Sequence, residues 1–490
     1  MRPTEKLPSS RSARRLLAAS LPVLGFTACT LFGASDAHAS GYLTARFGSD
    51  HGTPAAPNTY AIYYNPAALG GTTGTTITGD VALALRWAHY KRNDLALSPS
   101  GGARDRLLAD QKYLDSNTGD ANLLNLLALP YAGVNTDFGG SKYIRAGYAV
   151  YVPFGGLATW DRRPGVPGAP GTTDGVQRWH NISGQILAIY NTFAFAFRIP
   201  KAGLSFGISG SPIIHHVATV RARTGDNTDE IEDGTGALKE GRSLLDATGV
   251  NIGASAGVYW QSLDEHARWK IGASYLAQPG FGETRMKGTL DGRATGGTDV
   301  KQDIDFVQTY PHIFRLGLGY LMPNNKVELR TDFEYVTWST FDKQCVVLRG
   351  KDCNVDENGA QVGGAPNDIV LNIPRRWKNA VGYRLGAGYF LNEKLELFGS
   401  GAFTTSAVPK ETIDASTIDS FRLYGTAGAR YRVSDHFAFA ASYIHIFFFP
   451  VNTRDANIFD KQQNPSNSPS ADGKYTSQIG LLNLNIAYTF

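Results

Sequence analysis

The last nine residues of this chain alternate strictly between two kinds of side chain. One set is apolar or aromatic and the other is small or polar: Leu482, Leu484, Ile486, Tyr488 and Phe490 against Asn483, Asn485, Ala487 and Thr489. A period of two residues places the two sets on opposite faces of a β-strand. Such a strand separates either lipid from a wet lumen or a protein core from solvent.

The same alternation recurs along the chain and predicts an all-β fold. We count about fourteen strands, an even number that fits an antiparallel transmembrane β-barrel. The expected spans are 76–91, 126–137, 143–154, 182–197, 203–220, 248–262, 267–279, 305–321, 326–341, 376–390, 394–406, 419–432, 436–449 and 475–490. Short and long connections alternate between them, as in a barrel with both ends of the chain on its periplasmic side.

The N-terminus predicts export to the bacterial outer membrane. Residues 1–39 combine a basic start, the apolar stretch Leu16 to Phe32 and a small-x-small cleavage site at Ala37–Ala39, as in a secretory signal peptide. A lipoprotein signal cut before Cys29 is the alternative. No later apolar run reaches the roughly 18 residues of a membrane-spanning helix, which excludes a helical transporter.

The net charge and the C-terminal aromatic residue further limit the class of protein to which this chain can belong. The chain has 47 basic and 43 acidic residues, of which five and two lie in residues 1–39, leaving 42 and 41. This balance does not favour nucleic-acid binding. Export, length and a terminal aromatic residue favour a membrane barrel over a soluble β-sandwich, and Tyr488 and Phe490 resemble the assembly signal of outer-membrane barrels.

Residues 40–75 do not follow the strand pattern. They are rich in Gly, Ala, Pro and Asn and precede the first expected strand. A barrel of about fourteen strands has a lumen wide enough to leak solutes unless something fills it. We therefore expect residues 40–75 to form a hatch, or plug, inside a barrel made of residues 76–490. A disordered periplasmic leader is the alternative.

Two prolines interrupt neighbouring expected strands. Proline has no N–H to donate and is confined to edges and defects of a sheet. If the turn between these strands centres near Gly140, Pro130 and Pro153 fall in one stretch of the same ladder, and Gly147 removes a lumen side chain nearby. We expect a lateral opening in the wall here. Prolines that end their strands at the outer rim are the alternative.

The long connections carry two further features. The first is an unusually large number of apolar residues in a connection expected at the surface, residues 93–125. They are Leu107, Leu108, Tyr113, Leu114, Leu123 and Leu124. Such a patch indicates an outer capture groove for a hydrophobic ligand, or a cover over the barrel mouth. The second is the acidic run Asp226–Gly234, which does not match a calcium-binding loop and is interpreted as a solvated loop.

Two other functions stay open. Gly253–Gly257 matches the Gly-x-Ser-x-Gly motif of hydrolases around Ser255, but the chain continues as a strand where that motif needs a helix. A general diffusion porin would need an open lumen, which a hatch fills. No Cys/His spacing indicates zinc. We expect no enzyme activity, no metal, no cofactor and a monomer.

Four runs of residues resemble the FadL/TodX family of outer-membrane transporters for long-chain fatty acids and other hydrophobic compounds. They are Ser40–Tyr42, Tyr63–Leu69, Gly147–Gly155 and Phe333–Phe341. The resemblance covers essentially the whole exported chain. It implies a fourteen-stranded barrel closed by an N-terminal hatch, with Asn65, Pro66 and Ala67 of the hatch beside a kink in the third strand.

The resemblance also implies a route for the ligand. Substrate would enter an outer groove, reach a site inside the barrel and leave sideways through the wall near Pro153, Phe154 and Gly155. The Asn65 amide would then meet backbone groups left unpaired at Pro130 and Pro153. Expected partners are a hydrophobic or fatty-acid ligand, outer-membrane lipid and lipopolysaccharide, and the barrel assembly machinery. The compound carried is left open.

Two cysteines remain after residues 1–39 are removed. Cys345 and Cys353 are eight positions apart in a connection rich in Gly, Asp and Asn. In an exported chain this spacing predicts a disulfide that closes the loop. Two unpaired thiols are the alternative.

Replacing both cysteines by Ser should leave uptake and barrel folding unchanged. The bond closes a short outside loop, so it should stabilise that loop alone, by roughly 2–3 kcal/mol. Titration of the denatured, unreduced mature protein should find no free thiol. Detection of free thiols would contradict the bond, and loss of uptake in the double Ser variant would contradict its dispensability.

Overall fold

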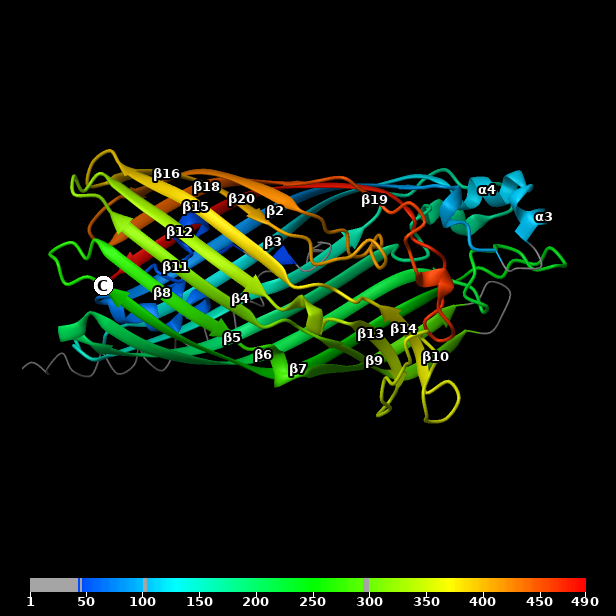
Figure 1. The fold of residues 1–490 in the computed structure, drawn as a ribbon, viewed down its shortest axis with the longest axis horizontal. Helices are drawn as coiled ribbons and strands as arrows, with labels where there is room; N and C mark the ends of the chain where they lie inside the picture. Colours follow the sequence, from blue (N-terminus) through cyan, green and yellow to red (C-terminus); the bar gives the residue numbers. More distant parts are fainter. Residues whose placement is uncertain (1–42, 45, 100–103, 294–298) are drawn as a thin grey trace, which may run out of the picture. The chain divides into compact units, whose positions relative to one another are not determined.

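The computed structural model describes residues 43, 44, 46–99, 104–293 and 299–490. The expected signal peptide, residues 1–39, and the run Ser40–Tyr42 lie outside the described residues. Within them, the fold is built from one continuous antiparallel sheet (Figure 1).

Fourteen strands of this sheet form a closed antiparallel barrel in the described part of the chain. In ring order they are β2 (Thr75–Arg92), β3 (Gly119–Thr136), β4 (Ile144–Thr159), β5 (Ser183–Ile199), β6 (Leu204–Arg223), β7 (Gly241–Gln261), β8 (Trp269–Leu276), β11 (Ile313–Leu321), β12 (Val327–Val336), β15 (Ala380–Phe390), β16 (Leu395–Thr404), β17 (Arg422–Arg432), β18 (Phe437–Phe448) and β20 (Gly473–Thr489). The ring closes where β20 pairs with β2, from Thr76↔Thr489 to Arg92↔Gly473. The expected barrel is confirmed.

The three largest changes to the expected strand boundaries concern β3, β7 and the expected strand 305–321. β3 begins at Gly119 and β7 at Gly241, each seven residues earlier than expected, so these strands rise further out of the wall. The expected strand 305–321 is two strands, β10 (Val300–Thr309) and β11, separated by Tyr310–His312. Pro311 explains this break, because it has no N–H for the ladder.

The broken strands form an extension at the end of the barrel that carries the long connections. β8 bends through the short helix η7 (Pro279–Phe281) into β9 (Glu283–Arg293), and β7 changes its partner from β8 to β9. From β9 the sheet continues through β10, β13 (Lys343–Leu348) and β14 (Ile369–Pro374). Figure 1 shows these strands at the end opposite the C-terminus. The disulfide between Cys345 in β13 and Cys353 is present here, which confirms that prediction.

The remaining elements are short. They are strands β1 (Leu43–Thr44) and β19 (Val451–Asn452), and helices η1 (Ser49–His51), α2 (Ala61–Tyr64), η2 (Pro66–Gly71), η3 (Asp94–Ala96), α3 (Arg104–Leu108), α4 (Gln111–Asn117), η5 (Pro170–Asp174), η6 (Pro200–Ala202), η8 (Trp338–Thr340) and η9 (Phe459–Lys461). None of the helices in the described residues is long and apolar enough to cross a membrane.

The outer connections are held by a buried ion pair rather than left in solvent. Arg92, at the end of β2, donates to the carboxylate of Asp229 at 2.8 Å, and both side chains are fully buried. Tyr113 of α4 donates to the same carboxylate at 2.5 Å. The interpretation of Asp226–Gly234 as a solvated loop is therefore wrong for Asp229, because this residue joins the first long connection to the barrel rim.

The N-terminal segment, which we define as residues 46–74, lies inside the barrel. It contacts strands on several sides of the ring: the Gly48 N–H donates to Asp80 of β2, Tyr131 of β3 donates to the Thr59 carbonyl, and Arg384 of β15 pairs with Asp50. Contacts to β2, β3 and β15 together place the segment in the lumen. The first barrel strand follows it at Thr75.

Glycines on three adjacent strands make room for this segment. A Cβ atom on Gly207 of β6 would lie 2.2 Å from the Ala67 nitrogen, and one on Gly257 of β7 would lie 2.0 Å from Asn65 Oδ1. On β8, a Cβ atom on Gly272 would lie 1.9 Å from the Pro54 carbonyl oxygen. The inner wall here is thus a cradle of bare backbone, against which η2 packs directly.

Replacing Gly207 by Ala should displace η2, because the atoms that the new methyl group meets belong to the backbone of residues 66 and 67. We expect a loss of about 1–3 kcal/mol in the free energy of unfolding, as for other overpacked sites, and faster proteolysis within residues 46–74. Gly210→Ala on the same strand is the control, since nothing lies within 4 Å of its Cβ position. Equal stability of the two variants would contradict the cradle.

Candidate functional site

The wall of the barrel is incomplete between β3 and β4. Their ladder runs from Thr136↔Ala146 to Tyr131↔Tyr151 and ends there, although β3 continues to Gly119 and β4 to Thr159. On the other side of β4, the register with β5 shifts between Tyr151 and Phe154. The strand bulges at this point, and residues 152–158 of β4 leave the β3 ladder.

The prolines account for where the ladder ends. Pro153 lies in the bulge and Pro130 lies one residue beyond the last β3–β4 pair, and neither can donate an N–H. Beyond the interruption, the side chain of Asn125 in β3 bonds to the backbone of Thr159 in β4. Its amide group donates to the Thr159 carbonyl at 3.1 Å, and its oxygen accepts from the Thr159 N–H at 2.9 Å. We call the stretch between residues 126–130 and 152–158 the wall gap.

Pro130, Pro153, Phe154 and Gly155 border the wall gap, but Gly147 does not. Gly147 pairs with both Asn135 and Ala194 in intact ladders. A Cβ atom there would lie 2.7 Å from the side chain of Ile62 in α2. The placement of Gly147 in a lateral opening is therefore wrong, since this glycine makes room for the N-terminal segment below the gap.

The edge of β4 that β3 leaves is partly taken by the start of the N-terminal region. β1 pairs antiparallel with β4, with Leu43 opposite Gly155 and Thr44 opposite Phe154. Two residues of backbone thus replace β3 at the bulge. The wall gap and the N-terminal region are in direct contact through main-chain pairing.

Aromatic side chains line the inner side of the wall gap. The Phe154 ring lies 5.6 Å from that of Tyr310 and 6.3 Å from those of Tyr190 and Trp338. Tyr190 stacks on Tyr151, which in turn stacks on Tyr131, at 5.6 Å for each pair. These rings give the inner mouth of the gap an apolar surface with few polar atoms.

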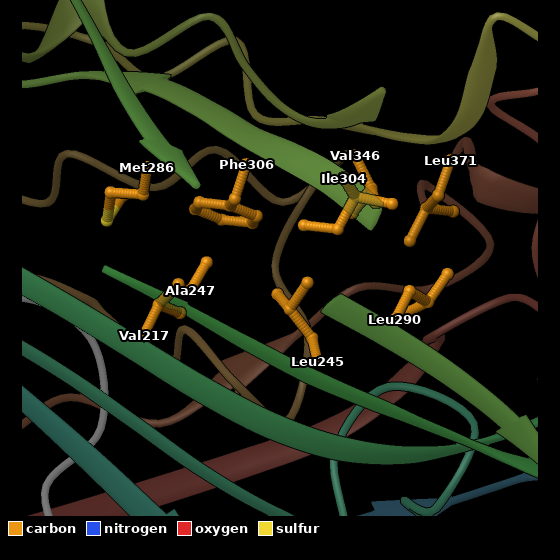
Figure 2. Close-up of a cluster of buried hydrophobic side chains, with 9 residues drawn as sticks. All are labelled: Val217, Leu245, Ala247, Met286, Leu290, Ile304, Phe306, Val346 and Leu371. Carbon is orange, nitrogen blue, oxygen red and sulfur yellow. The ribbon is translucent and has the colours of Figure 1, made fainter. Parts of the chain in front are cut away.

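An apolar cavity lies beside the wall gap, in the outer half of the barrel. It lies against a cluster of nine buried side chains that face one another in two rows in Figure 2. Six of them line the cavity, Val217, Leu245, Leu290, Phe306, Val346 and Leu371, and Ala247, Met286 and Ile304 complete the cluster. The cavity has a volume of about 90 Å³ and is also lined by Gly156 and Ala158 of β4. These two residues belong to the wall gap, so the cavity and the gap share a boundary.

One free cation faces this cavity in the described part of the chain. Arg375 bonds to Gln344 at 2.8 Å and to Asp414 at 2.9 Å, and it is therefore neutralised. Burial lowers the pKa of His180 to about 4, so this imidazole is uncharged at neutral pH. Arg221 makes neither a hydrogen bond nor an ion pair with any described residue, and it lines the same cavity. Arg221 is half-buried, and a partly desolvated guanidinium without a partner favours an anionic ligand.

The Asn-Pro-Ala element lies elsewhere than expected. The Asn65 amide donates to the Pro54 carbonyl at 2.8 Å and to the Val258 carbonyl of β7 at 3.0 Å, while its oxygen accepts from the Ala67 N–H. These partners lie over the glycine cradle, not at Pro130 and Pro153. The expected contact between Asn65 and the interrupted ladder is therefore wrong. The Asn-Pro-Ala element packs against the glycines of β6, β7 and β8, because a wall without side chains allows its backbone to come this close.

The expected capture groove does not form one surface. Leu107, Leu108, Tyr113 and Leu114 pack together with Leu97 in the first long connection. Leu123 and Leu124 lie on β3, where alternation turns Leu123 into the barrel and leaves Leu124 outside with 54% of its surface exposed. The six residues are therefore split among a loop cluster, the lumen and the outer wall.

Two other sequence features have ordinary places in the wall. Ser255 lies in the middle of β7, paired on both sides, and its hydroxyl bonds to that of Ser209 at 2.6 Å. It is not on the strand-to-helix turn that a nucleophilic serine of this motif needs. Tyr488 and Phe490 are exposed on the outer face, with their rings 4.9 Å apart. Their role in assembly stays a prediction.

Sequence reasoning missed most of the cavity. Arg221, Leu245, Phe306 and Leu371 all line the cavity, but they come from four strands, β6, β7, β10 and β14, and are brought together only in the folded barrel. Arg221 carried a weak signal, since a charged residue at an inward position of an apolar strand needs either a partner or water.

Solved structures with the same fold share little sequence with this chain. A Pseudomonas aeruginosa FadL homologue aligns with a TM-score of 0.68 at 16% identity, covering 93% of this chain and 98% of that one. The Ralstonia pickettii toluene transporter TbuX gives a TM-score of 0.57 at 14% identity, covering 93% and 99%. The Pseudomonas putida toluene transporter TodX gives 0.58 at 14% identity, covering 92% and 98%. At this identity the likeness shows the fold alone.

A search among curated proteins finds no match. The model of one protein family, described as "Outer membrane protein transport protein (OMPP1/FadL/TodX)", matches residues 26–490. This match spans almost the whole chain and includes every strand of the barrel. The chain belongs to the OMPP1/FadL/TodX family of outer membrane transport proteins.

Proposed function

We propose that this outer-membrane transporter of hydrophobic compounds releases its cargo sideways through the wall gap into the membrane. The observation that carries the proposal is the early end of the β3–β4 ladder at Tyr131 and Tyr151. The apolar cavity shares Gly156 and Ala158 with the gap, so cargo in the cavity lies beside the exit. An apolar molecule that leaves by this route need not pass through water.

The N-terminal segment acts as the hatch in this proposal. It occupies the lumen below the cavity, and its glycine cradle and its ion pair between Asp50 and Arg384 hold it there. A filled lumen argues against a general diffusion porin, and the regular strand around Ser255 argues against a lipid hydrolase. Transport is passive and follows a gradient of binding, and the protein acts as a monomer.

We further propose that the cargo is an amphiphile with an acidic head, such as a long-chain fatty acid. Arg221 would bind the carboxylate, and the apolar cluster of the cavity would surround the hydrocarbon chain. A charge-assisted hydrogen bond would satisfy the guanidinium that has no protein partner. The solved relatives TbuX and TodX are named as transporters of toluene, a neutral aromatic molecule. The cargo proposed for this chain would differ from toluene by its acidic head group.

Replacing Gly155 by Trp should block the exit, because its Cβ position points at Leu129, 3.3 Å away across the gap. We expect uptake of radiolabelled oleate by cells without another such transporter to fall at least tenfold, with heat-modifiable barrel folding retained. Gly210→Trp on the outer face of β6 is the control. Uptake at the wild-type rate in the Gly155 variant would show that the lateral route is wrong.

Replacing Arg221 by Gln should weaken binding of oleate and spare oleyl alcohol. A hydrogen bond to a charged group contributes about 1.5–3 kcal/mol, which corresponds to roughly 10–150-fold in Kd. Arg223→Gln is the matched control, since Arg223 already bonds to Asn227 and to the Val370 carbonyl. Titration of both ligands by calorimetry measures the effect. Equal affinity changes for acid and alcohol would contradict a carboxylate site.

A further inference from the structure

Two further cavities flank the N-terminal segment, and we call them the upper and the lower polar cavity. The lower one is mainly polar, whereas the upper one combines charged residues of β12, β15 and β17 with apolar residues such as Phe403 and Ile444. The upper polar cavity has a volume of about 80 Å³ and is lined by Asp50, Tyr64 and Arg422, among others. The lower polar cavity has a volume of about 430 Å³, lies next to the short turn at residues 434–436, and is lined by His51 and Asn58, among others. Neither cavity shares a lining residue with the apolar cavity.

The inward face of β17 runs along both cavities. Tyr424 and Thr426 line the upper polar cavity, and Arg430 and Arg432 line the lower one. Thr426 and Arg430 are four positions apart, which is only about 13 Å of strand. One inward position, Gly428, lies between the two cavities.

A thin septum of side chains occupies the level of Gly428. The Phe398 ring lies directly on this glycine, because a Cβ atom there would be 2.5 Å from Phe398 Cζ and 2.6 Å from Ser442 Cβ. The His51 ring packs edge-on against Phe398 at 4.8 Å and bonds to Glu396 at 3.0 Å. We define the septum as Phe398, His51 and Ser442.

Unpaired polar atoms at the septum indicate water. Ser49 Oγ, Asp50 Oδ2, Ser442 Oγ and Asn483 Oδ1 are buried and have no hydrogen-bond partner among the described residues. Buried polar atoms are nearly always bonded to protein or to ordered water. Ser442 and Asn483 lie in register with Gly428 and Phe398, so two of these atoms are at the level of the septum, where they favour bound water.

The charge of the lower polar cavity favours anions. Arg430 and Arg432 line it, and both are exposed residues whose guanidinium groups form no hydrogen bond or ion pair within the described residues. Asp435 is the acidic residue among the lining residues. Two unpaired guanidinium groups in a narrow polar space attract small anions and repel cations.

We propose that the two polar cavities are halves of one passage for water and small inorganic anions, closed by the Phe398 septum. This passage does not use the apolar cavity, since neither polar cavity shares a lining residue with it, and it meets the wall gap at Trp338, which lines the upper polar cavity and contacts Phe154. Displacement of η1, which carries His51, or rotation of the Phe398 ring opens it. Its selectivity comes from Arg430 and Arg432.

The test is conductance of purified protein in planar lipid bilayers with a KCl gradient. Phe398→Ala should raise the conductance at least fivefold over the wild type, with a reversal potential that shows preference for chloride. Leu397→Ala is the control, since this neighbouring side chain is 45% exposed on the outer face. Adding Arg430→Gln and Arg432→Gln to Phe398→Ala should remove the anion preference and leave a conducting pore.

A second measurement does not depend on the Phe398 variant. Ser442→Cys in the otherwise unchanged protein should react with a small anionic thiol reagent at least fivefold faster than with its cationic counterpart of equal size. A folded Phe398→Ala barrel that conducts no more than the wild type would overturn the passage. Cation preference, or an introduced thiol that is inert to both reagents, would overturn it as well.

Discussion

Closure of the backbone hydrogen-bond ring is the constraint on which this structure depends. Lipid offers no partner for an N–H or C=O group, so a membrane-spanning sheet must have no free edge. The β2–β20 ladder, from Thr76↔Thr489 to Arg92↔Gly473, joins the two ends of the barrel and removes that edge. Alternation of inward and outward side chains and the placement of long connections at one end follow from this closure. The β3–β4 interface departs from it, and there Asn125 and β1 supply substitute pairing.

The lumen is divided by the chemistry of its walls. Strands β6, β7, β9, β10, β13 and β14 present the apolar cluster of the outer half, and β12 and β15–β17 present charged side chains to the N-terminal segment. Two kinds of interaction hold the N-terminal segment: close backbone packing on one side and ion pairs on the other. Glycines on β6, β7 and β8 allow backbone contact, and ion pairs such as Asp50 with Arg384 fix the opposite side. In the arrangement that we propose, one filled barrel offers an apolar exit on one side and a passage for small anions on another.

Most of the wall was predictable from the sequence, and most of the site was not. Strand alternation is local, so segments such as 76–91 and 475–490 were placed within a few residues of β2 and β20. Pro130 and Pro153 both lie where the β3–β4 ladder ends, and each lacks an N–H whatever its surroundings. Asn65 was assigned to the wrong strands and Gly147 to the wrong stretch of wall. Both errors concern contacts between a segment without periodicity and a curved sheet, where nothing local specifies which strand is met.

The sequence by itself determined that this chain forms a closed barrel with a non-strand segment before it, because a two-residue period acts on each strand separately. It also determined that Cys345 and Cys353 are close enough to bond. Only the tertiary structure decided where the ladder fails, which face of the lumen receives Asn65, and that Arg221 meets the apolar cluster without a partner. Strand register and lumen packing couple residues hundreds of positions apart, and their positions are set by the closed ring as a whole rather than by any one segment.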